Sequence, residues 1–168
     1  MFNNDLIVEH VYFGVDDIKD KYHLYDCLLE KLYIEMDISD KFVFGKTFDL
    51  LTDTYFKNSN LYKNSVDYEI KTKSLTYFLK NKNDYLGGII CRPTEEFIDT
   101  CIISIVLIFS QFRSHGYGKY LLNYVLNDLK TKYNFKHFGL RCMNCNDVAV
   151  KLYQSFGFSP MATFMLKM

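Results

Sequence analysis

IISIVLIF (102–109) decides the fold of this chain, together with the RSHGYG (113–118) and YLLNYVLNDL (120–129) that follow it. The first segment is apolar and rich in β-branched residues, which predicts a buried strand. The last has apolar residues at helical spacing. Between them, glycine allows a ligand to approach the main chain closely. A strand, a glycine-bearing turn and a helix N-terminus together predict a phosphate-binding loop, because N–H groups and the helix dipole converge there.

The loop differs from two familiar phosphate-binding sequences. It lacks the Gly-Lys-Ser/Thr of a Walker sequence and the Gly-x-Gly-x-x-Gly spacing of a dinucleotide-binding turn. Considered alone, it has a second interpretation: a tight strand-to-helix turn that uses glycine for its geometry. Further along, NDVAVKLYQSFGF (146–158) predicts a short helix, with Asn146 as its N-cap and Gly157 as a left-handed stop before a last strand.

Together the two segments resemble the GNAT superfamily of acetyl-CoA-dependent N-acetyltransferases. Arg-x-x-Gly-x-Gly at 113–118 is similar to the coenzyme loop of that family. Asn-x-x-Ala-x-x-Leu-Tyr-x-x-x-Gly-Phe at 146–158 is similar to its second signature. The resemblance covers about residues 74 to 168 well and the first 70 in outline. It implies an acyltransferase that uses acetyl-CoA as co-substrate and needs no metal.

Composition limits the partners. The 168 residues are expected to form a single N-acetyltransferase domain, 1–168. Lys+Arg and Asp+Glu both number 20, which argues against nucleic acid as a partner. No apolar run has membrane-spanning length and the N-terminus does not resemble a signal peptide, so a cytoplasmic protein is expected. The five cysteines are expected to be reduced, and Cys142-x-x-Cys145 has no second pair to complete a zinc site.

The order of predicted elements is β-α-α-β-β-β-α-β-α-β. Strands are predicted at 6–13, 74–79, 85–92, 98–109, 136–143 and 162–167 and a loop at 57–73. Helices are predicted at about 16–36 and 40–56, from the 113–118 loop to about 133, and at 146–156. This order predicts an α/β fold of the α+β type, with a mixed, mostly antiparallel central sheet flanked by helices.

The resemblance assigns the coenzyme contacts largely to main chain. It implies that backbone amides of the loop hold the pyrophosphate, and that amides near the end of the central strand bind the pantetheine and polarise the thioester carbonyl. Asn146 would cap its helix and touch the coenzyme, and the Arg113 side chain would add a charge-assisted contact. The residues expected to bind coenzyme are Leu107, Ile108, Phe109, Arg113, Ser114, His115, Gly116, Tyr117, Gly118, Lys119 and Asn146.

The catalytic side chains are fewer. Tyr153 matches the family tyrosine that protonates the departing sulfur, although the same spacing also suits a core tyrosine of an amphipathic helix. The position of the glutamate base in protein-acetylating relatives falls on Ile102, and that of a histidine base falls on Arg141. Asp99 is the candidate base that remains. A solvated acid at a hairpin end, or a water chain with no dedicated base, are the alternatives.

The favoured acceptor is a small amino-sugar phosphate such as glucosamine 6-phosphate. Arg92 and Arg141 are predicted to lie at the acceptor end of the sheet, and arginine matches phosphate bidentately. The segments at 97–101 and 140–142 resemble those of glucosamine-phosphate N-acetyltransferases, which are typically dimers, so a homodimer is implied. The first alternative is a protein N-terminal or lysine acetyltransferase, which 87–93 and 122–127 resemble; the second is a non-catalytic acetyl-CoA-binding module.

Overall fold

The computed structural model describes residues 5–44, 65–95, 97–142 and 146–161, with main chain alone at 37–44 and 65. Its strands are β1 (Ile7–Tyr12), β2 (Leu75–Lys80), β3 (Tyr85–Pro93), β4 (Thr100–Ile108) and β5 (His137–Leu140). Its α-helices are α1 (Tyr22–Phe44), α3 (Ser65–Thr72), α4 (Tyr117–Thr131) and α5 (Asp147–Ser155).

The strands form one sheet in the order β1-β2-β3-β4-β5. The first four pair antiparallel, and β5 pairs parallel to β4. The predicted fold class is confirmed: a mixed, mostly antiparallel sheet flanked by helices. The parallel pair exists because α4 carries the chain from the end of β4 back to the start of β5.

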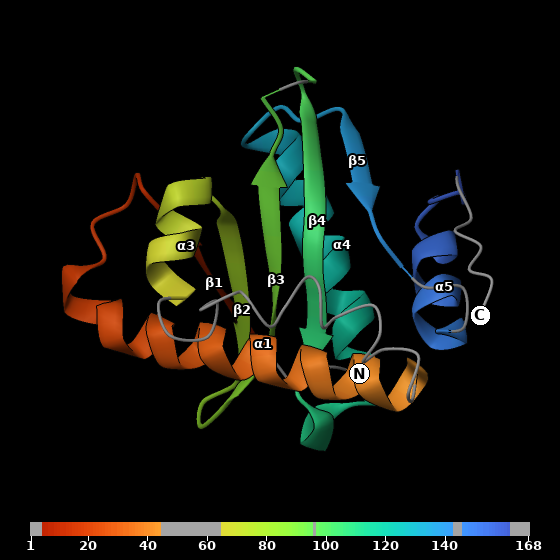
Figure 1. Ribbon diagram of the computed structural model, residues 1–168, viewed down its shortest axis with the longest axis horizontal. Coiled ribbons are helices and arrows are strands. Elements are labelled where there is room, and N and C mark those ends of the chain that lie inside the picture. The colour runs from red at the N-terminus through yellow and green to blue at the C-terminus, as the bar shows by residue number, and fades with distance from the viewer. Residues whose placement is uncertain (1–4, 45–64, 96, 143–145, 162–168) are drawn as a thin grey trace.

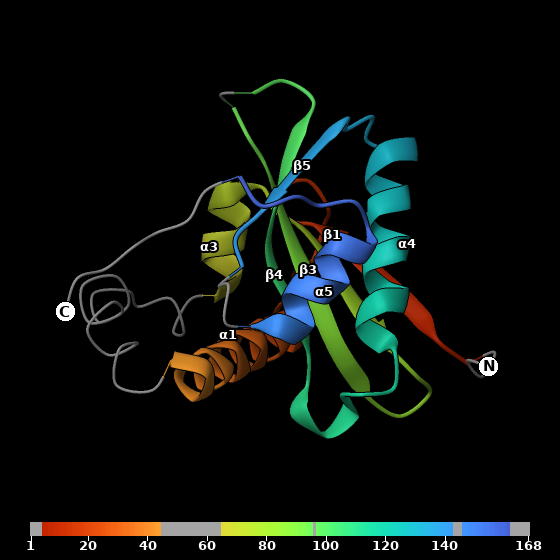
Figure 2. The same cartoon turned by 90° about the vertical axis from the view of Figure 1, so that its right-hand side faces the viewer.

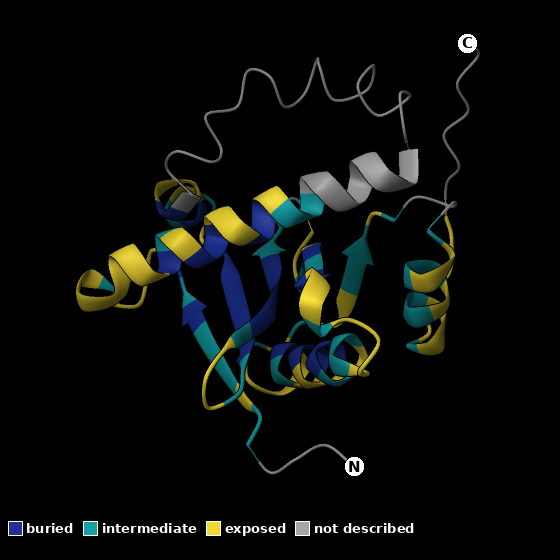
Figure 3. Cartoon of the chain, turned by 90° about the horizontal axis from the view of Figure 1, so that it is seen from below, coloured by how far each residue is buried: buried dark blue, intermediate teal, exposed yellow. Residues whose placement is uncertain are grey.

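Helices cover both faces of this sheet. α1 and α3 lie on one face, α4 lies on the other, and α5 lies beside the β5 edge (Figures 1 and 2). Figure 3 shows that α1 turns its buried residues toward the sheet and its exposed ones away. On the α1 face the core includes Leu29, Phe78 and Ile90; on the α4 face it includes Ile89 and Val125. β4 contributes to both cores, so its position is fixed from both sides.

The N-terminal helix differs from its prediction in both bounds. Asp16 does not open it: its carboxylate accepts a hydrogen bond from the Tyr12 N–H (2.7 Å) and closes the turn after β1. The helix begins at Tyr22 after a 3₁₀ turn at Lys19–Lys21. It then continues to Phe44, through the break predicted between 36 and 40. The rest of the second predicted helix, 45–56, lies outside the described residues.

The predicted loop at 57–73 is wrong over its described part, where α3 forms. Val66 and Glu69 are buried and Ile70 is partly buried on the inner side of this short helix. The charged residue at a buried position obscures the apolar period, which explains why the sequence pattern did not indicate a helix.

The other elements agree with prediction to within about three residues at each end. Asn146 caps α5 as expected, because its Oδ1 accepts the Ala149 N–H (3.2 Å). Gly157 follows with a left-handed φ of 86°. The last predicted strand, 162–167, lies outside the described residues. Within the described part, no helix has the length and apolar character needed to span a membrane.

Candidate active site

The loop between β4 and α4 directs main-chain N–H groups off the start of a helix. Gly116 precedes α4 with a left-handed φ of 79°, and Tyr120 donates to the Gly116 carbonyl (3.1 Å). The amides before Tyr120, among them those of Gly118 and Lys119, therefore precede the helical hydrogen-bond ladder. Together with the positive end of the helix dipole they suit an anion.

The two glycines of the loop, Gly116 and Gly118, are needed for different reasons. Gly116 needs its left-handed φ, and Ser114 before it also has a positive φ of 65°. Gly118 lies within the helix, and a Cβ there would meet only Ile108 Cγ1 and Leu152 Cδ2, both at 3.8 Å. Those are ordinary contacts, so packing inside the protein does not require glycine at 118. The missing side chain leaves the amide open to a ligand.

The charged side chains of the loop are held by its neighbours. Arg113 Nε donates to the Ile108 carbonyl (2.8 Å), and its Nη2 lies 3.8 Å from Glu35 Oε2 on α1. The same Glu35 oxygen accepts the Ser110 N–H (2.8 Å). His115 Nδ1 lies 2.6 Å from the Arg113 carbonyl, and its ring stacks on Tyr117 at 5.7 Å. His115 is exposed.

One edge of β4 is open next to this loop. β5 pairs with β4 only from Thr100 to Ile103, so in the described part of the chain no strand covers the opposite edge from Ser104 to Ile108. We call this stretch the free edge, and the point after the Ile103–Leu140 pair, where β4 and β5 separate, the fork. An extended ligand can pair with a strand edge of this kind through main-chain hydrogen bonds.

Alternation along the strand decides which amides face the free edge. The Phe109 N–H donates to the Leu86 carbonyl on the β3 side (2.8 Å), and Leu107 faces the same way because successive residues alternate. The carbonyl and N–H of Ile108 face the free edge, because the Arg113 side chain reaches that carbonyl from outside the sheet. By the same alternation, the N–H of Val106 also faces the free edge. Of the three predicted strand residues, Ile108 directs its N–H to the free edge, as Val106 does, whereas Leu107 and Phe109 direct theirs toward β3.

A β-bulge lies at the fork. Ile90 pairs with Ile105 and Cys91 with Ile103, so Ser104 is an extra residue on β4. A bulge leaves the ladder locally unpaired and redirects the strand. The bulge and the end of β5 pairing therefore coincide, and together they begin the free edge. Sequence reasoning missed this feature, and period-2 alternation carries no signal for a single inserted residue.

α5 flanks the start of α4. A Cβ on Gly118 would lie 3.8 Å from Leu152 Cδ2, so α5 packs against the start of α4. Tyr153 is half-buried, and its ring meets Phe158 edge-on at 6.1 Å. Asn146 uses its side-chain oxygen as the helix cap.

Asp99 lies at the opposite end of β4. Its carboxylate pairs with Lys136 (2.7 Å), and its carbonyl accepts the N–H groups of Lys136 and His137. That contact raises the pKa of Lys136. From Asp99 to Ile108 the strand spans about 30 Å. Asp99 therefore lies away from the coenzyme loop, in the turn between β3 and β4, where it contacts Lys136 and His137 at the start of β5.

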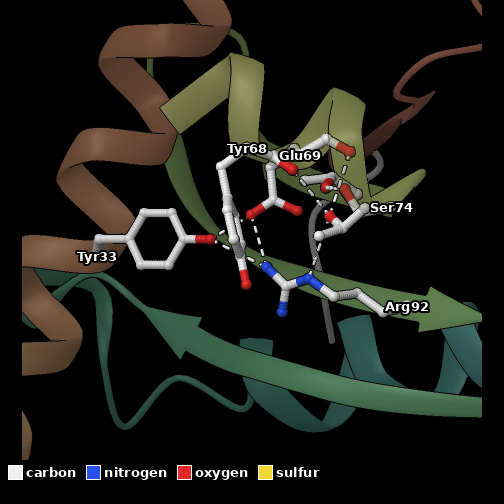
Figure 4. Close-up of polar contacts among 7 residues, drawn as sticks. Tyr33, Tyr68, Glu69, Ser74 and Arg92 are labelled. Carbon is white, nitrogen blue, oxygen red and sulfur yellow. Dashed lines mark hydrogen bonds and ion pairs between the residues drawn. The ribbon is translucent and has the colours of Figure 1, made fainter. Parts of the chain in front are cut away.

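Arg92 is engaged with Glu69 beneath α3 (Figure 4). Its Nη2 donates to Glu69 Oε1 (2.7 Å) and to the Tyr33 hydroxyl (3.0 Å), which in turn donates to the same Glu69 oxygen. Burial opposes the charge on Arg92, but the Glu69 carboxylate outweighs it and raises the Arg92 pKa. Burial, together with Glu69, raises the pKa of Tyr33. Arg92, which the sequence analysis expected to bind a substrate phosphate, therefore has its charge balanced by Glu69.

Arg141, by contrast, is exposed directly after β5. Arg141 directly follows Leu140, the last β5 residue that pairs with β4, so it lies near the start of the free edge. Among the described residues, no group of three or more His, Cys, Asp or Glu side chains could hold a metal ion.

Comparison with known proteins agrees with this geometry. Residues 44–158 match the model of a family described as "Acetyltransferase (GNAT) family". A search of curated proteins finds no match.

Solved structures give the same result at the level of fold. YycN of Bacillus subtilis, named as an acetyltransferase, is 19% identical, with a TM-score of 0.62 over 95% of this chain and 98% of that one. The aminoglycoside acetyltransferase meta-AAC0020, from an uncultured soil metagenomic sample and in complex with sisomicin, is 14% identical, with a TM-score of 0.62 over 98% and 97%. Aminoglycoside N-acetyltransferase AAC(6')-Iy, in complex with CoA, is 10% identical, with a TM-score of 0.62 over 97% and 93%.

Proposed function

We propose that this chain, which belongs to the acetyltransferase (GNAT) family, moves the acetyl group of acetyl-CoA directly to the primary amine of a small molecule. The observation that carries the proposal is the free edge of β4, which runs from the fork to the N-terminus of α4. A single extended thioester can place its pyrophosphate on the loop and its carbonyl beside strand amides.

The loop from Arg113 to Lys119 holds the pyrophosphate in this proposal. Arg113 leaves the Ile108 carbonyl and turns to the phosphates, and the exposed amides at the start of α4 supply hydrogen bonds that gain strength from the dipole. Along the free edge, the Val106 and Ile108 amides align the pantetheine. A main-chain N–H near the Ser104 bulge then polarises the thioester carbonyl, as a preorganised donor does for any developing oxyanion.

The chemical step is a direct attack. The amine nitrogen forms a bond to the thioester carbon, the C–S bond breaks, and Tyr153 donates a proton or hydrogen bond to the departing thiolate; the new amide nitrogen releases its extra proton through water, which restores the Tyr153 hydroxyl. The acceptor ammonium must first lose a proton. Since Asp99 lies near the far end of β4 and Ile102 is apolar, that proton passes to water rather than to a dedicated carboxylate of the strand.

Glucosamine 6-phosphate is the acceptor we would test first. Arg141 is exposed beyond the fork, and its planar guanidinium can bind a phosphate bidentately. Support for an amine-bearing sugar as acceptor comes from the aminoglycoside acetyltransferases of the same fold. A homodimer and a cytoplasmic location are part of the same proposal, and light scattering of the purified chain tests the first.

Turnover tests the proposal. Purified protein is mixed with acetyl-CoA and glucosamine 6-phosphate, glucosamine, sisomicin, or peptides with a lysine or an unblocked N-terminus, and thiol release is followed. We expect release with the sugars and not with the peptides. Turnover on peptides alone would establish the protein-amine alternative. Acetyl-CoA binding without turnover on any amine would instead indicate the non-catalytic module.

A further inference from the structure

The fully buried polar side chains of the described residues gather at one place. They are Glu69, Ser74 and Thr76, all 0% exposed, and they lie between α3 and the α1 face of the sheet. The Ser74 and Thr76 hydroxyls lie 3.3 Å apart, and the Ser74 N–H donates to the Glu69 carbonyl (3.1 Å). Buried polar groups cost stability unless they are partnered, so a concentration of them in an apolar core requires an explanation.

Glu69 contacts Arg92 through only one of its two carboxylate oxygens. Oε1 accepts hydrogen bonds from Arg92 Nη2 and from the Tyr33 hydroxyl, whereas Oε2 has no hydrogen-bond partner. The guanidinium is further fixed by Thr72 Oγ1 at Nε (3.4 Å) and by the Tyr68 ring, 5.2 Å from Cζ. The third nitrogen, Nη1, points away from Glu69 and Tyr33 (Figure 4). Arg92 thus presents N–H donors while its charge is already balanced.

The register places this pair on the acceptor side of the fork. Arg92 stands opposite Ile102 on β4, and Ile102 stands opposite Gly139 on β5. These three residues lie in one row across the sheet, one residue pair before the last β4–β5 pair, Ile103–Leu140. α4 and α5 occupy the other side of the fork (Figure 2), which leaves the α1 and α3 side for the acceptor. The Arg92 side chain is 20% exposed there, and that of Glu69 is 0% exposed.

We propose that Glu69 determines acceptor specificity: by balancing the charge of Arg92, it makes this corner of the site bind an uncharged oxygen, such as a sugar hydroxyl, and disfavour an anion. The inference rests on the proposed function. Any phosphate of the acceptor is then bound by Arg141 and not by Arg92. An uncompensated guanidinium attracts an anion strongly in a partly desolvated site, whereas a balanced pair leaves only its hydrogen bonds.

Glu69→Gln is a clean way to remove this balance. Glutamine keeps the shape and the oxygen that accepts from Arg92 and Tyr33. Its amide nitrogen takes the place of Oε2, where no donor loses a partner because none is present. The measurement is kcat/KM for glucosamine 6-phosphate divided by kcat/KM for glucosamine. We expect Glu69→Gln to raise this ratio about tenfold.

Three further variants test charge, shape and the source of the phosphate preference. The double variant Glu69→Gln/Arg92→Met removes both charges with little change in volume, and its ratio should return to within about threefold of the wild-type value. Tyr33→Phe loses a hydroxyl without changing charge and should leave the ratio unchanged. Arg141→Gln should abolish the preference for the phosphate, since Arg92 contributes none.

A folded, active Glu69→Gln protein with an unchanged ratio would overturn the inference. So would a preference for phosphate that survives in Arg141→Gln, which keeps the buried pair intact. A readout without turnover separates this from failure of the proposed function. The rise in Tm on adding inorganic phosphate should be larger in Glu69→Gln than in either the wild type or the double variant. Equal rises in all three would contradict the inference even for a protein that acetylates no amine.

Discussion

The coenzyme side of the candidate site is built from main chain, whereas the acceptor side is built from side chains of separate elements. Val106, Ile108 and the start of α4 offer N–H groups that any sequence of the right conformation supplies. Arg92 and Glu69 come from β3 and α3, and in the inference above each matters for its charge. In the proposed function, main-chain groups therefore bind the acetyl donor, whereas a few charged side chains select the acceptor.

The largest expected effect comes from placing charge on the coenzyme side. Gly118→Asp puts a carboxylate beside the amides that receive the pyrophosphate, and we expect the Kd for acetyl-CoA to rise at least about 100-fold by repulsion and blockage. The helix itself should not suffer, because an acidic residue in the first turn favours it by about 0.3–1 kcal/mol. Calorimetric titration and thermal melting measure the two effects.

Gly118→Ala is the matched control. Its Cβ meets only ordinary contacts at 3.8 Å, so the protein should fold normally and lose far less affinity than the aspartate variant. Equal losses in both variants would mean that bulk, and not charge, governs this position, and would weaken the description of the coenzyme side as an anion site.

A smaller effect is expected where the coenzyme side does use a side chain. Tyr153→Phe should lower kcat about 100-fold while leaving the Kd for acetyl-CoA unchanged, because the hydroxyl acts on the leaving thiolate. Tyr124→Phe, at a residue 42% exposed on α4, is the control and should change neither quantity. Loss of coenzyme affinity without loss of kcat in Tyr153→Phe would assign the residue to binding instead.

A side chain at Gly87 on β3 should displace β4 and with it the free edge. A Cβ at Gly87 on β3 would lie 2.2 Å from the Leu107 carbonyl oxygen and 2.7 Å from Ile108 Cα, so Gly87→Ala must displace β4. We expect a loss of about 1–3 kcal/mol in unfolding free energy together with weaker coenzyme binding. Gly157→Ala, with no atom within 4 Å but a φ of +86°, should cost about 1 kcal/mol and leave coenzyme affinity intact. Urea unfolding and titration decide between them.

Glu9 is expected to have a smaller effect than Gly87 and provides a contrast to Glu69. Its two oxygens accept from Lys21, Lys80, Tyr25 and Tyr85. Burial would raise its pKa, but the lysine and tyrosine contacts outweigh burial and lower it from 4.5 to about 2. Glu9→Gln should cost about 1–2 kcal/mol at neutral pH and should leave acceptor preference unchanged.

The pH dependence follows from the sign of that shift. Because the folded pKa is lower than the unfolded one, the contribution of Glu9 is fully present above pH 4.5 and is lost as the pH falls toward about 2. The stability difference between wild type and Glu9→Gln should therefore shrink over this interval. A difference that stays constant down to pH 2 would show that the carboxylate charge contributes nothing.

How far the sequence predicted the site depends on the same contrast. The coenzyme loop is contiguous from Arg113 to Lys119, and glycine and strand signals mark it locally. The Arg92 cluster joins residues 23 and 59 positions apart, as its contacts to Glu69 and Tyr33 show. No local pattern announces that pairing, and a buried glutamate weakened the one helical signal available for α3.

Two other failures have physical causes. Composition could not reveal that Asp16 would cap a turn after β1 instead of a helix, since both uses satisfy the same carboxylate. The extra residue at Ser104 is invisible to alternation because it changes one pairing and leaves the pattern apolar. The orientation of Phe109 toward β3 follows from that register, and sequence alone could not assign it.

The free edge of β4 has a consequence for the genetic tolerance of the enzyme. Lysine outnumbers arginine seventeen to three in this chain and tryptophan is absent, as expected of an AT-rich coding sequence. Substitutions that follow such a codon bias change side chains but keep the main-chain peptide groups. At Val106 and Ile108 every residue except proline supplies the same N–H. Changes in codon usage can therefore replace surface side chains while the main-chain N–H groups of the free edge persist.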